Sequence, residues 1–398
     1  MVVLTQNIVF SFWVEDGMLK KKVRGENRMK KLGFGMMRLP LINPQDDTSI
    51  DIERVKVMAD RFMEEGFTYF DTATPYHGKQ SEVAFREAVA KRYPRESYTV
   101  TDKLSLFMIE KASDMPAFFD AQLENLGVEY IDIYLLHALS KELYQKATEF
   151  DAFAFAAKKK EEGKIKHIGF SFHDKAEVLD RILTEHPEVE YVQLQLNYLD
   201  WEDDNIQSRA CYEVAMKHGK QILVMEPVKG GSLAIVSSEV EQMFKAYNKE
   251  ASVASWAVRF VAGLENVVMV LSGMSDESQM EDNLSYMKDF VPMNEEELAM
   301  VEKAAQMIRE DIAIPCTACR YCVEDCPMQI AIPEYFKIYN VLKQLQGTKE
   351  QDRRRQYARV AKDHGKASDC IACGKCEEHC PQHIKIRECL KDVAASLE

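Results

Sequence analysis

The sequence predicts an α/β fold in which a (β/α)8 barrel is followed by a second, mainly helical module. From Leu32 to about residue 290, short apolar runs alternate with amphipathic stretches of helical periodicity. Polar residues follow several of these runs at regular intervals, as expected for a site at the carboxyl face of a barrel. Nine of the ten cysteines lie after residue 315, which marks a separate C-terminal unit.

Eight segments rich in apolar, β-branched and aromatic residues are expected to form strands. They cover residues 33–38, 67–71, 98–103, 131–136, 165–171, 191–196, 221–226 and 267–272. Amphipathic stretches between them, such as Asp51 to Glu65 and Ser81 to Arg92, predict helices. Glycines just past four helix ends are expected to form left-handed caps: Gly66, Gly127, Gly163 and Gly219. Eight units favour a closed barrel over an open six-stranded sheet, and no Gly-x-Gly-x-x-Gly motif follows a strand.

Length and charge restrict the possible functions. The 398 residues accommodate one barrel of about 250 residues and a small module. The net charge of −14 argues against non-specific nucleic-acid binding. No apolar run reaches the ~20 residues of a membrane span. Ile314-Pro315 marks a boundary, so we expect the barrel over residues 29–311 and the module over residues 312–398.

Residues 1–28 do not fit this pattern. An apolar stretch from Val2 to Val14 precedes the basic residues, and no small-residue cleavage site follows, which is unlike a signal peptide. One interpretation is an added strand or hairpin that closes the barrel bottom. The other, which we favour, is an extension foreign to the native protein, because Met29 directly precedes the first barrel-like residues.

Four polar residues at predicted strand ends suggest carbonyl chemistry. Asp71 ends the second strand, Tyr76 follows a turn, and Lys103 and His137 follow two later strands. A phenol has an ordinary pKa of ~10, and we expect the Lys103 ammonium, held by Asp71, to lower the pKa of Tyr76. His137 is placed to orient a carbonyl oxygen as charge develops on it. The alternative is that Tyr76 is a turn residue and His137 a buried core histidine.

The sequence Asp71-Thr-Ala-x-x-Tyr76, followed by Lys103 and then Leu-Leu-His137, resembles the aldo/keto reductase family from about Leu32 to Phe290. The ordered set of four is specific, although each member alone is not. The resemblance implies the same four catalytic roles, a small-molecule carbonyl substrate and hydride transfer from NAD(P)H bound across the barrel mouth.

The resemblance also implies where the nicotinamide cofactor binds. Ser171 and Gln193 would hold the carboxamide, and Met225 stands where many members carry a tyrosine that stacks on the nicotinamide. A glutamine at position 279 cannot match the charge of an arginine against a 2′-phosphate, which leaves the choice between NADH and NADPH open. The remaining expected cofactor contacts are Gly35, Met36, Pro227, Gly230, Gly231, Gly273, Ser275, Gln279 and Asn283.

Two cysteine motifs repeat at an offset of 54 residues, from Cys316 to Cys370. Each has the spacing Cys-x2-Cys-x2-Cys-x3-Cys-Pro and resembles the bacterial ferredoxin module, which binds two [4Fe–4S] clusters. In that pattern the fourth cysteine of each motif binds the other cluster. The resemblance therefore implies one set of Cys316, Cys319, Cys322 and Cys380, and a second set of Cys370, Cys373, Cys376 and Cys326.

Zinc ribbons and disulfides are the alternatives, but the spacing and the lack of an export signal disfavour them. The long insert between the motifs predicts two helices, Pro333 to Gln346 and Lys349 to Lys362. Cys211 and Cys389 are left over as ordinary thiols. Oxygen-sensitive clusters suggest a cytoplasmic protein.

Nicotinamides transfer two electrons together, whereas a cluster transfers one. We therefore weigh three functions. The first is an NAD(P)H-dependent carbonyl reductase with a cluster module that exchanges electrons with a ferredoxin-type partner. The second replaces the nicotinamide by FMN or FAD bound in the same barrel. The third is an electron-transfer module with an idle barrel.

Overall fold

The computed structural model describes residues 30–44, 46–204, 206–344 and 350–398. Both interpretations of residues 1–28 concern a segment that lies outside the described residues. Among the described residues, no helix is long and apolar enough to cross a membrane.

Eight parallel strands form a closed barrel in sequence order, and β8 pairs with β1. This confirms the predicted fold class and all eight predicted strands. The strands are β1 Leu32–Gly35, β2 Tyr69–Asp71, β3 Thr99–Leu104, β4 Ile131–Leu139, β5 Ile165–Phe172, β6 Tyr191–Gln195, β7 Gln221–Met225 and β8 Val267–Ser272.

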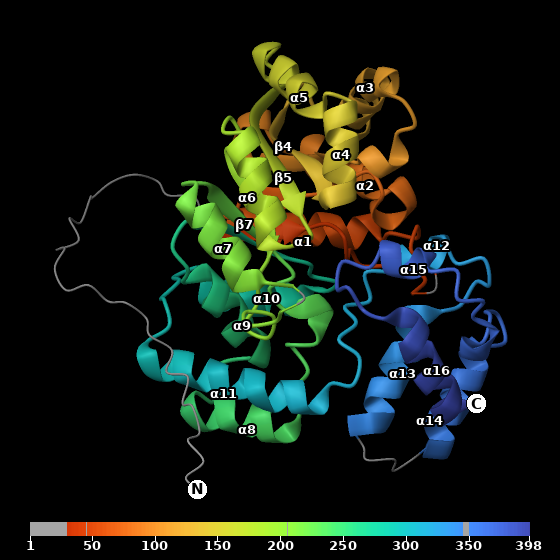
Figure 1. Cartoon of the computed structure of the whole chain (residues 1–398). Helices are drawn as coiled ribbons and strands as arrows, with labels where there is room; N and C mark the ends of the chain where they lie inside the picture. The colour runs from red at the N-terminus through yellow and green to blue at the C-terminus, as the bar shows by residue number, and fades with distance from the viewer. Residues whose placement is uncertain (1–29, 45, 205, 345–349) are drawn as a thin grey trace, which may run out of the picture.

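Helices cover the outside of the barrel (Figure 1). They are α1 Ile52–Glu64, α2 Ser81–Phe85, α3 Met115–Leu126, α4 Lys141–Glu149, α5 Ala152–Glu161, α6 Ala176–Glu185, α7 Ser208–Lys217, α8 Ser238–Tyr247, α9 Val253–Ala262, α10 Glu277–Met287 and α11 Glu295–Asp311. The expected single helix from Ser81 to Arg92 is instead α2 followed by a π-helical turn over Arg86–Ala90.

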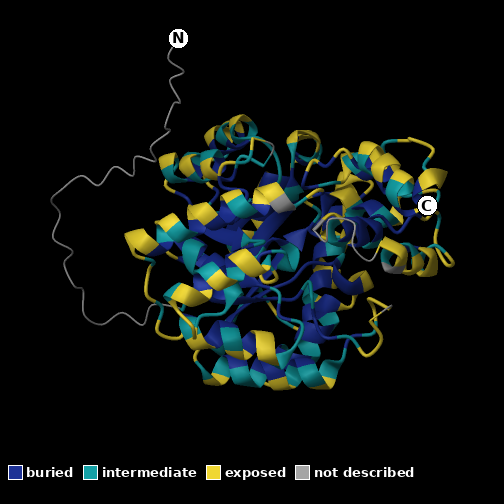
Figure 2. Ribbon diagram, turned by 90° about the horizontal axis from the view of Figure 1, so that it is seen from below, coloured by how far each residue is buried: buried dark blue, intermediate teal, exposed yellow. Residues whose placement is uncertain are grey.

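Burial follows the layers of the barrel, with exposed residues on the outer faces of the helices (Figure 2). In α1, the buried face consists of Val55, Met58, Ala59 and Phe62, as the periodicity predicts. This face packs in the core between strands and helices. A smaller cluster of apolar side chains from four strands also packs together: Tyr69, Ile133, Leu135, Leu223, Met269 and Leu271.

The C-terminal module is mainly helical, as predicted. It contains α12 Tyr321–Glu324, α13 Ile332–Gln344, α14 Glu350–Val360, α15 Lys375–Glu378 and α16 Ile386–Leu397. In Figure 1, α12 and α15 lie above α13, α14 and α16. The predicted helices of the insert correspond to α13 and α14, and the apolar repeat positions near the two cysteine motifs are buried: Ile330, Ile332, Ile384 and Ile386.

The four predicted glycine caps all have the left-handed conformation, with φ between +64° and +78°. At Gly127, which ends α3, a Cβ atom would also lie 2.8 Å from Cγ of Arg86. A side chain at this position therefore meets both backbone strain and crowding.

We expect Gly127→Ala to lower the free energy of unfolding by about 1–2 kcal/mol, the cost of a left-handed alanine. The matched control is Gly263→Ala, because Gly263 has φ −76° and its nearest neighbours lie at 3.5 Å. That control should be neutral or stabilising by up to ~1 kcal/mol. Urea unfolding followed by circular dichroism measures both, and equal losses would contradict the assignment.

Candidate functional site

The closed barrel brings the four predicted catalytic residues together at the carboxyl ends of β2, β3 and β4. Lys103 Nζ lies 2.6 Å from Asp71 Oδ1 and 2.7 Å from the carbonyl oxygen of Thr72. The same Nζ lies 4.9 Å from the centre of the Tyr76 ring. The ring of His137 meets that of Tyr76 edge-on, with centroids 6.0 Å apart. The Lys103–Asp71 pair thus lies against the ring of Tyr76, and the ring of Tyr76 contacts that of His137.

The expectation that Lys103 lowers the pKa of Tyr76 is wrong. Burial, followed by the charges of Asp71, Asp102 and Glu226, raises the pKa of Tyr76 well above its ordinary value. Asp71 accepts from Lys103 at 2.6 Å and so neutralises much of its field at the phenol. Tyr76 therefore carries its proton at neutral pH, which suits a proton donor.

His137 is buried and uncharged. Burial, followed by the charges of Lys103 and His173, lowers the pKa of His137 well below its ordinary value. Nδ1 of His137 lies 2.7 Å from the hydroxyl of Ser105. If Ser105 donates this bond, Nε2 carries the ring proton and faces away from Ser105, ready to donate. Ser105 was not identified from the sequence, although it follows Lys103 by two residues.

A buried polar network lies behind Lys103 and was also missed. Asp102 is fully buried, and burial together with the charge of Glu82 raises the pKa of Asp102 well above its ordinary value. Nε2 of Gln122 lies 3.0 Å from Oδ2 of Asp102 and 2.9 Å from the carbonyl oxygen of Lys103. Oε1 of Glu82 accepts from the hydroxyl of Thr74. This network fixes the backbone that carries Lys103.

The two residues expected to hold a carboxamide occupy paired positions on neighbouring strands, since Ser171 of β5 is in register with Gln193 of β6. Gln193 donates to Oδ2 of Asp71 at 3.0 Å. The hydroxyl of Ser171 accepts from the backbone N–H of Ala138 at 2.7 Å, which leaves its own proton available. Met225 ends β7 and is partly exposed.

The loops after β1 and β8 approach one another closely. A Cβ at Gly35 would lie 3.3 Å from the carbonyl oxygen of Ser272, and one at Gly273 would lie 3.3 Å from Cβ of Arg38. Met36, in contrast, has its side chain in the core, and its backbone N–H donates to Asp71 O at 2.8 Å. Met36 thus presents neither its side chain nor its N–H to a ligand.

The expected adenosine-phosphate residues are largely satisfied by neighbours within the protein. The hydroxyl of Ser275 donates to the carbonyl oxygen of Arg38 at 2.9 Å. The side chain of Gln279 accepts from the N–H of Ser275 and donates to Asp276. Asn283 is buried, and its amide donates to Ser272 at 2.7 Å.

The loop after β7 meets the C-terminal module. Pro227 is buried, and a Cβ at Gly230 would lie 2.2 Å from the carbonyl oxygen of Thr317. Nothing lies within 4 Å of the corresponding Cβ position at Gly231. Lys229 is buried and forms a 2.5 Å ion pair with Asp200. Of the loop residues named here, Gly231 is the one with free space beside its backbone.

The cysteines gather around two pockets in the module. The inner pocket is lined by Cys316, Thr317, Cys319, Arg320, Cys322, Ile332, Pro333, Phe336, Cys380, Gln382, Ile384 and Ile386. The outer pocket is lined by Cys326, Pro327, Met328, Ile330, Ile332, Cys370, Ile371, Cys373, Gly374, Cys376, Arg387 and Leu390. Each pocket thus contains one of the two crossed ligand sets that the resemblance implies.

The chemistry of both pockets fits an iron–sulfur cluster. Each offers four thiols in a mainly apolar wall. Within the described ranges, no group of three or more His, Cys, Asp or Glu side chains is placed to hold a metal ion. Cysteines that surround a volume suit a cluster, whose thiolates bind its outer corners, better than a single zinc ion.

The module is seated on the barrel mouth through two segments, one in each cysteine motif. Arg38 donates to the carbonyl oxygen of Thr317 at 2.9 Å. Gln382 accepts from Gln195 and from Lys229, each at 3.0 Å, and donates back to Gln195 at 2.9 Å. These contacts join residues up to 279 positions apart in the chain.

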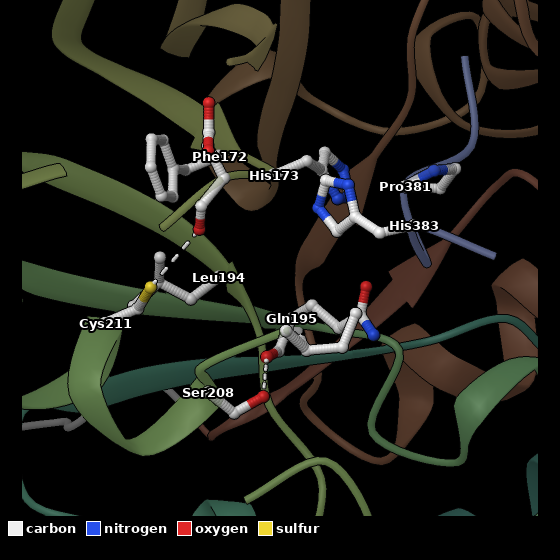
Figure 3. A pocket seen from close by; sticks show the side chains of 10 residues that line it. Phe172, His173, Leu194, Gln195, Ser208, Cys211, Pro381 and His383 are labelled. Atoms are coloured by element: carbon white, nitrogen blue, oxygen red, sulfur yellow. Dashed lines mark hydrogen bonds between the residues drawn. The ribbon is translucent and has the colours of Figure 1, made fainter. Parts of the chain in front are cut away.

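A further pocket opens at this seam, between the ends of β5 and β6 and the module (Figure 3). His173 of the barrel and His383 of the module both line it. Burial, followed by the charge of His383, lowers the pKa of His173 to about 4. Burial raises the pKa of the Cys211 thiol to about 12, so this cysteine is an unreactive part of the wall.

Two family models match the chain. The model for the aldo/keto reductase family covers residues 31–306, and the model for a 4Fe-4S dicluster domain covers residues 315–384.

Curated relatives match parts of the barrel. An aldo-keto reductase of Mycolicibacterium smegmatis is 30% identical over 147 residues, which is 36% of this chain and 46% of the relative. An uncharacterized oxidoreductase of Schizosaccharomyces pombe is 24% identical over 65% of this chain and 82% of its own length. An NADH-specific methylglyoxal reductase of Escherichia coli is 26% identical over 42% of this chain and 54% of its own length.

Solved structures share the fold of the barrel. The holo form of an aldo-keto reductase from Bacillus halodurans superposes with a TM-score of 0.55, at 20% identity, over 69% of this chain and 91% of its own. An aldo/keto reductase from Klebsiella pneumoniae in complex with NADP and acetate gives a TM-score of 0.55 at 19% identity, with the same coverage. At these identities the likeness concerns the fold alone.

We expect anaerobically prepared protein to contain about eight iron and eight acid-labile sulfide per chain, because two four-iron clusters fill the two pockets. Iron and sulfide analysis, with an absorption spectrum, measures this. Stoichiometric zinc in colourless protein would contradict the assignment.

Proposed function

The chain belongs to the aldo/keto reductase family and carries a 4Fe-4S dicluster domain, and we propose that it reduces a small carbonyl compound with NAD(P)H, with Tyr76 as the proton donor. The observation that carries this proposal is the Lys103–Asp71 ion pair beneath a protonated Tyr76. Hydride addition to a carbonyl requires a proton donor and a hydrogen bond to the oxygen, and Tyr76 and His137 supply both from adjacent positions.

The chain's own residues have distinct tasks in this scheme. The hydroxyl of Tyr76 gives its proton to the carbonyl oxygen, and the Lys103–Asp71 pair, with Nζ of Lys103 4.9 Å from the ring centre, positions the phenol. Neutral His137 donates a hydrogen bond from Nε2, and Ser105 holds the ring in that tautomer. The dinucleotide, when bound, supplies the hydride.

Features of the barrel mouth support a nicotinamide dinucleotide. Ser171 and Gln193 project from paired positions beside Asp71, where a carboxamide needs partners. Arg38 supplies a cation between the β1 and β8 loops, and Gly231 leaves its loop open. Gln279 offers no positive charge to a 2′-phosphate, so we expect little preference for NADPH over NADH. The comparisons name NADP and NADH for relatives and neighbours and give the flavin alternative no support.

For the module we propose electron exchange with a ferredoxin-type partner. The crossed cysteine sets would hold the clusters, each of which carries one electron when present. An idle barrel is disfavoured, because a buried lysine, acid, phenol and histidine are kept in mutual contact. A merely structural barrel gains nothing from these buried polar groups.

Tyr76→Phe tests the proposal. We expect the variant to lose carbonyl reduction by at least ~10²-fold, which is typical of a removed general acid, while it binds NADPH as the parent does. Turnover is measured with a small aldehyde, and binding by fluorescence titration. A variant with near-parental turnover would remove Tyr76 from the mechanism, and a parent that binds neither NADH nor NADPH would refute the whole scheme.

The raised pKa of Tyr76 also predicts a pH profile. Reduction needs the phenol, so kcat/KM should be flat from about pH 7 to about pH 9 and fall only as the pH rises through a pKa above the ordinary ~10. Alcohol oxidation needs the phenolate, so its kcat/KM should rise about tenfold per pH unit over the same range. Steady-state rates in both directions check this. A decline in reduction centred below pH 9 would show that Lys103 does lower this pKa.

A further inference from the structure

The two cluster pockets differ in what surrounds them. The inner pocket is lined by Thr317 and Gln382, the two residues that bind the barrel mouth. The outer pocket is lined instead by Ile371, whose side chain is 60% exposed, and by the exposed Cys373. One pocket therefore borders the barrel site and the other borders solvent.

Gln382 connects the inner pocket to the ends of β6 and β7. It follows Cys380 by two residues, and its amide is buried. Its oxygen accepts from both Gln195 and Lys229, and its nitrogen donates to Gln195. Lys229 is held in turn by Asp200 at 2.5 Å. A buried amide with three bonds has one orientation, so the cysteine loop cannot shift without the barrel.

Arg38 connects the inner pocket to the loops after β1 and β8. Its aliphatic stem packs over Gly273, and its guanidinium donates to the carbonyl oxygen of Thr317, which directly follows Cys316. A guanidinium has five N–H donors, and this is its one hydrogen bond among the residues that the structure describes. No carboxylate there forms an ion pair with it. Arg38 thus has capacity for an anion in the mouth while it holds the cluster loop.

Glu226 lies at the same junction. The positive charges of Lys229 and Arg38 both act on its carboxylate. Oε2 of Glu226 and the hydroxyl of Thr317 are both buried and interact with one another. Charges in the mouth and charges at the inner pocket thus act on one another through a buried region, where electrostatic effects are strong.

We propose that the barrel mouth and the inner pocket form one coupled centre, in which Arg38 and Gln382 transmit binding of an anionic dinucleotide to the redox potential of the inner cluster. The outer cluster faces solvent and does not respond. The inference rests on the proposed function for the identity of the ligand. A negative diphosphate beside Arg38 opposes the addition of an electron to the inner cluster. The reduced protein must then bind the ligand more weakly, by reciprocity.

The test uses ADP-ribose, which carries the diphosphate but has no nicotinamide to accept hydride. Anaerobic protein is titrated electrochemically with mediators, and the reduced clusters are followed by electron paramagnetic resonance. We expect ADP-ribose to bind about tenfold more weakly to the reduced than to the oxidised protein, which lowers one midpoint potential by about 59 mV for a one-electron couple. The other midpoint should move by less than a fifth of that amount.

Four variants assign the effect to residues. Arg320→Gln, the matched control, removes an arginine from the inner pocket wall that does not bond to the barrel. It should lower the inner midpoint without ligand, which identifies that cluster, and keep the ligand-induced shift. Arg38→Gln and Gln382→Ala should each reduce the ligand-induced shift at least threefold at unchanged iron content. Arg38→Lys keeps the positive charge and should retain most of the shift. This variant replaces Arg38→Gln in the comparison if Arg38→Gln loses its clusters.

The outcomes separate this inference from the proposed function. If neither ADP-ribose nor NADPH binds, the proposed function fails. If ADP-ribose binds and both midpoints stay in place, or both move equally, the coupling is refuted. A full shift in both Arg38→Gln and Gln382→Ala would also overturn the inference, because the effect would then pass through other residues.

Discussion

The geometry of the candidate site depends on the ion pair between Lys103 and Asp71. Burying two charges costs several kcal/mol unless their hydrogen-bonding capacity is filled. Here the ammonium also binds the carbonyl oxygen of Thr72, and the second carboxylate oxygen accepts from Gln193. These partners come from β2, β3 and β6, so the pair requires the barrel to be closed in its observed register. The carboxylate of Asp71 also neutralises much of the charge of Lys103. Burial therefore has the largest effect on the pKa of Tyr76.

The strand ends that complete the site also seat the module. Gln193 and Gln195 alternate along β6: the first donates to Asp71 and the second to Gln382. The buried Lys229 donates to Asp200 and also to the same Gln382. Gly230 lets the backbone of Thr317 approach where any side chain would collide. The module is therefore a wall of the barrel mouth and not a separate appendage.

The sequence was informative where chemistry is local or periodic. Eight apolar runs, the Asp71–Tyr76 spacing and the repeated cysteine motif each fit within a short window, and they led to the barrel, the four candidate catalytic residues and the dicluster module. The sequence did not identify four further residues, because their roles come from contacts between residues 19 to 279 positions apart: Ser105, Gln122, Arg38 and Gln382. The direction of the Tyr76 pKa was missed for the same reason. That pKa is raised by burial and by three acids, which act in the same direction and which only the folded barrel brings near.

The crossing of the cysteine sets has a consequence for how the protein matures. Cys380 contributes to the inner pocket although its neighbours in the second motif line the outer one, and Cys326 does the reverse. Neither motif alone supplies all four thiols of a pocket, so both motifs must be present before either set is complete. The last ligand of the inner pocket in chain order is Cys380, and Gln382 follows it by two residues. The contacts that cover the ends of β6 and β7 therefore form only after the second motif has been made, and a chain that lacks this motif would leave them uncovered.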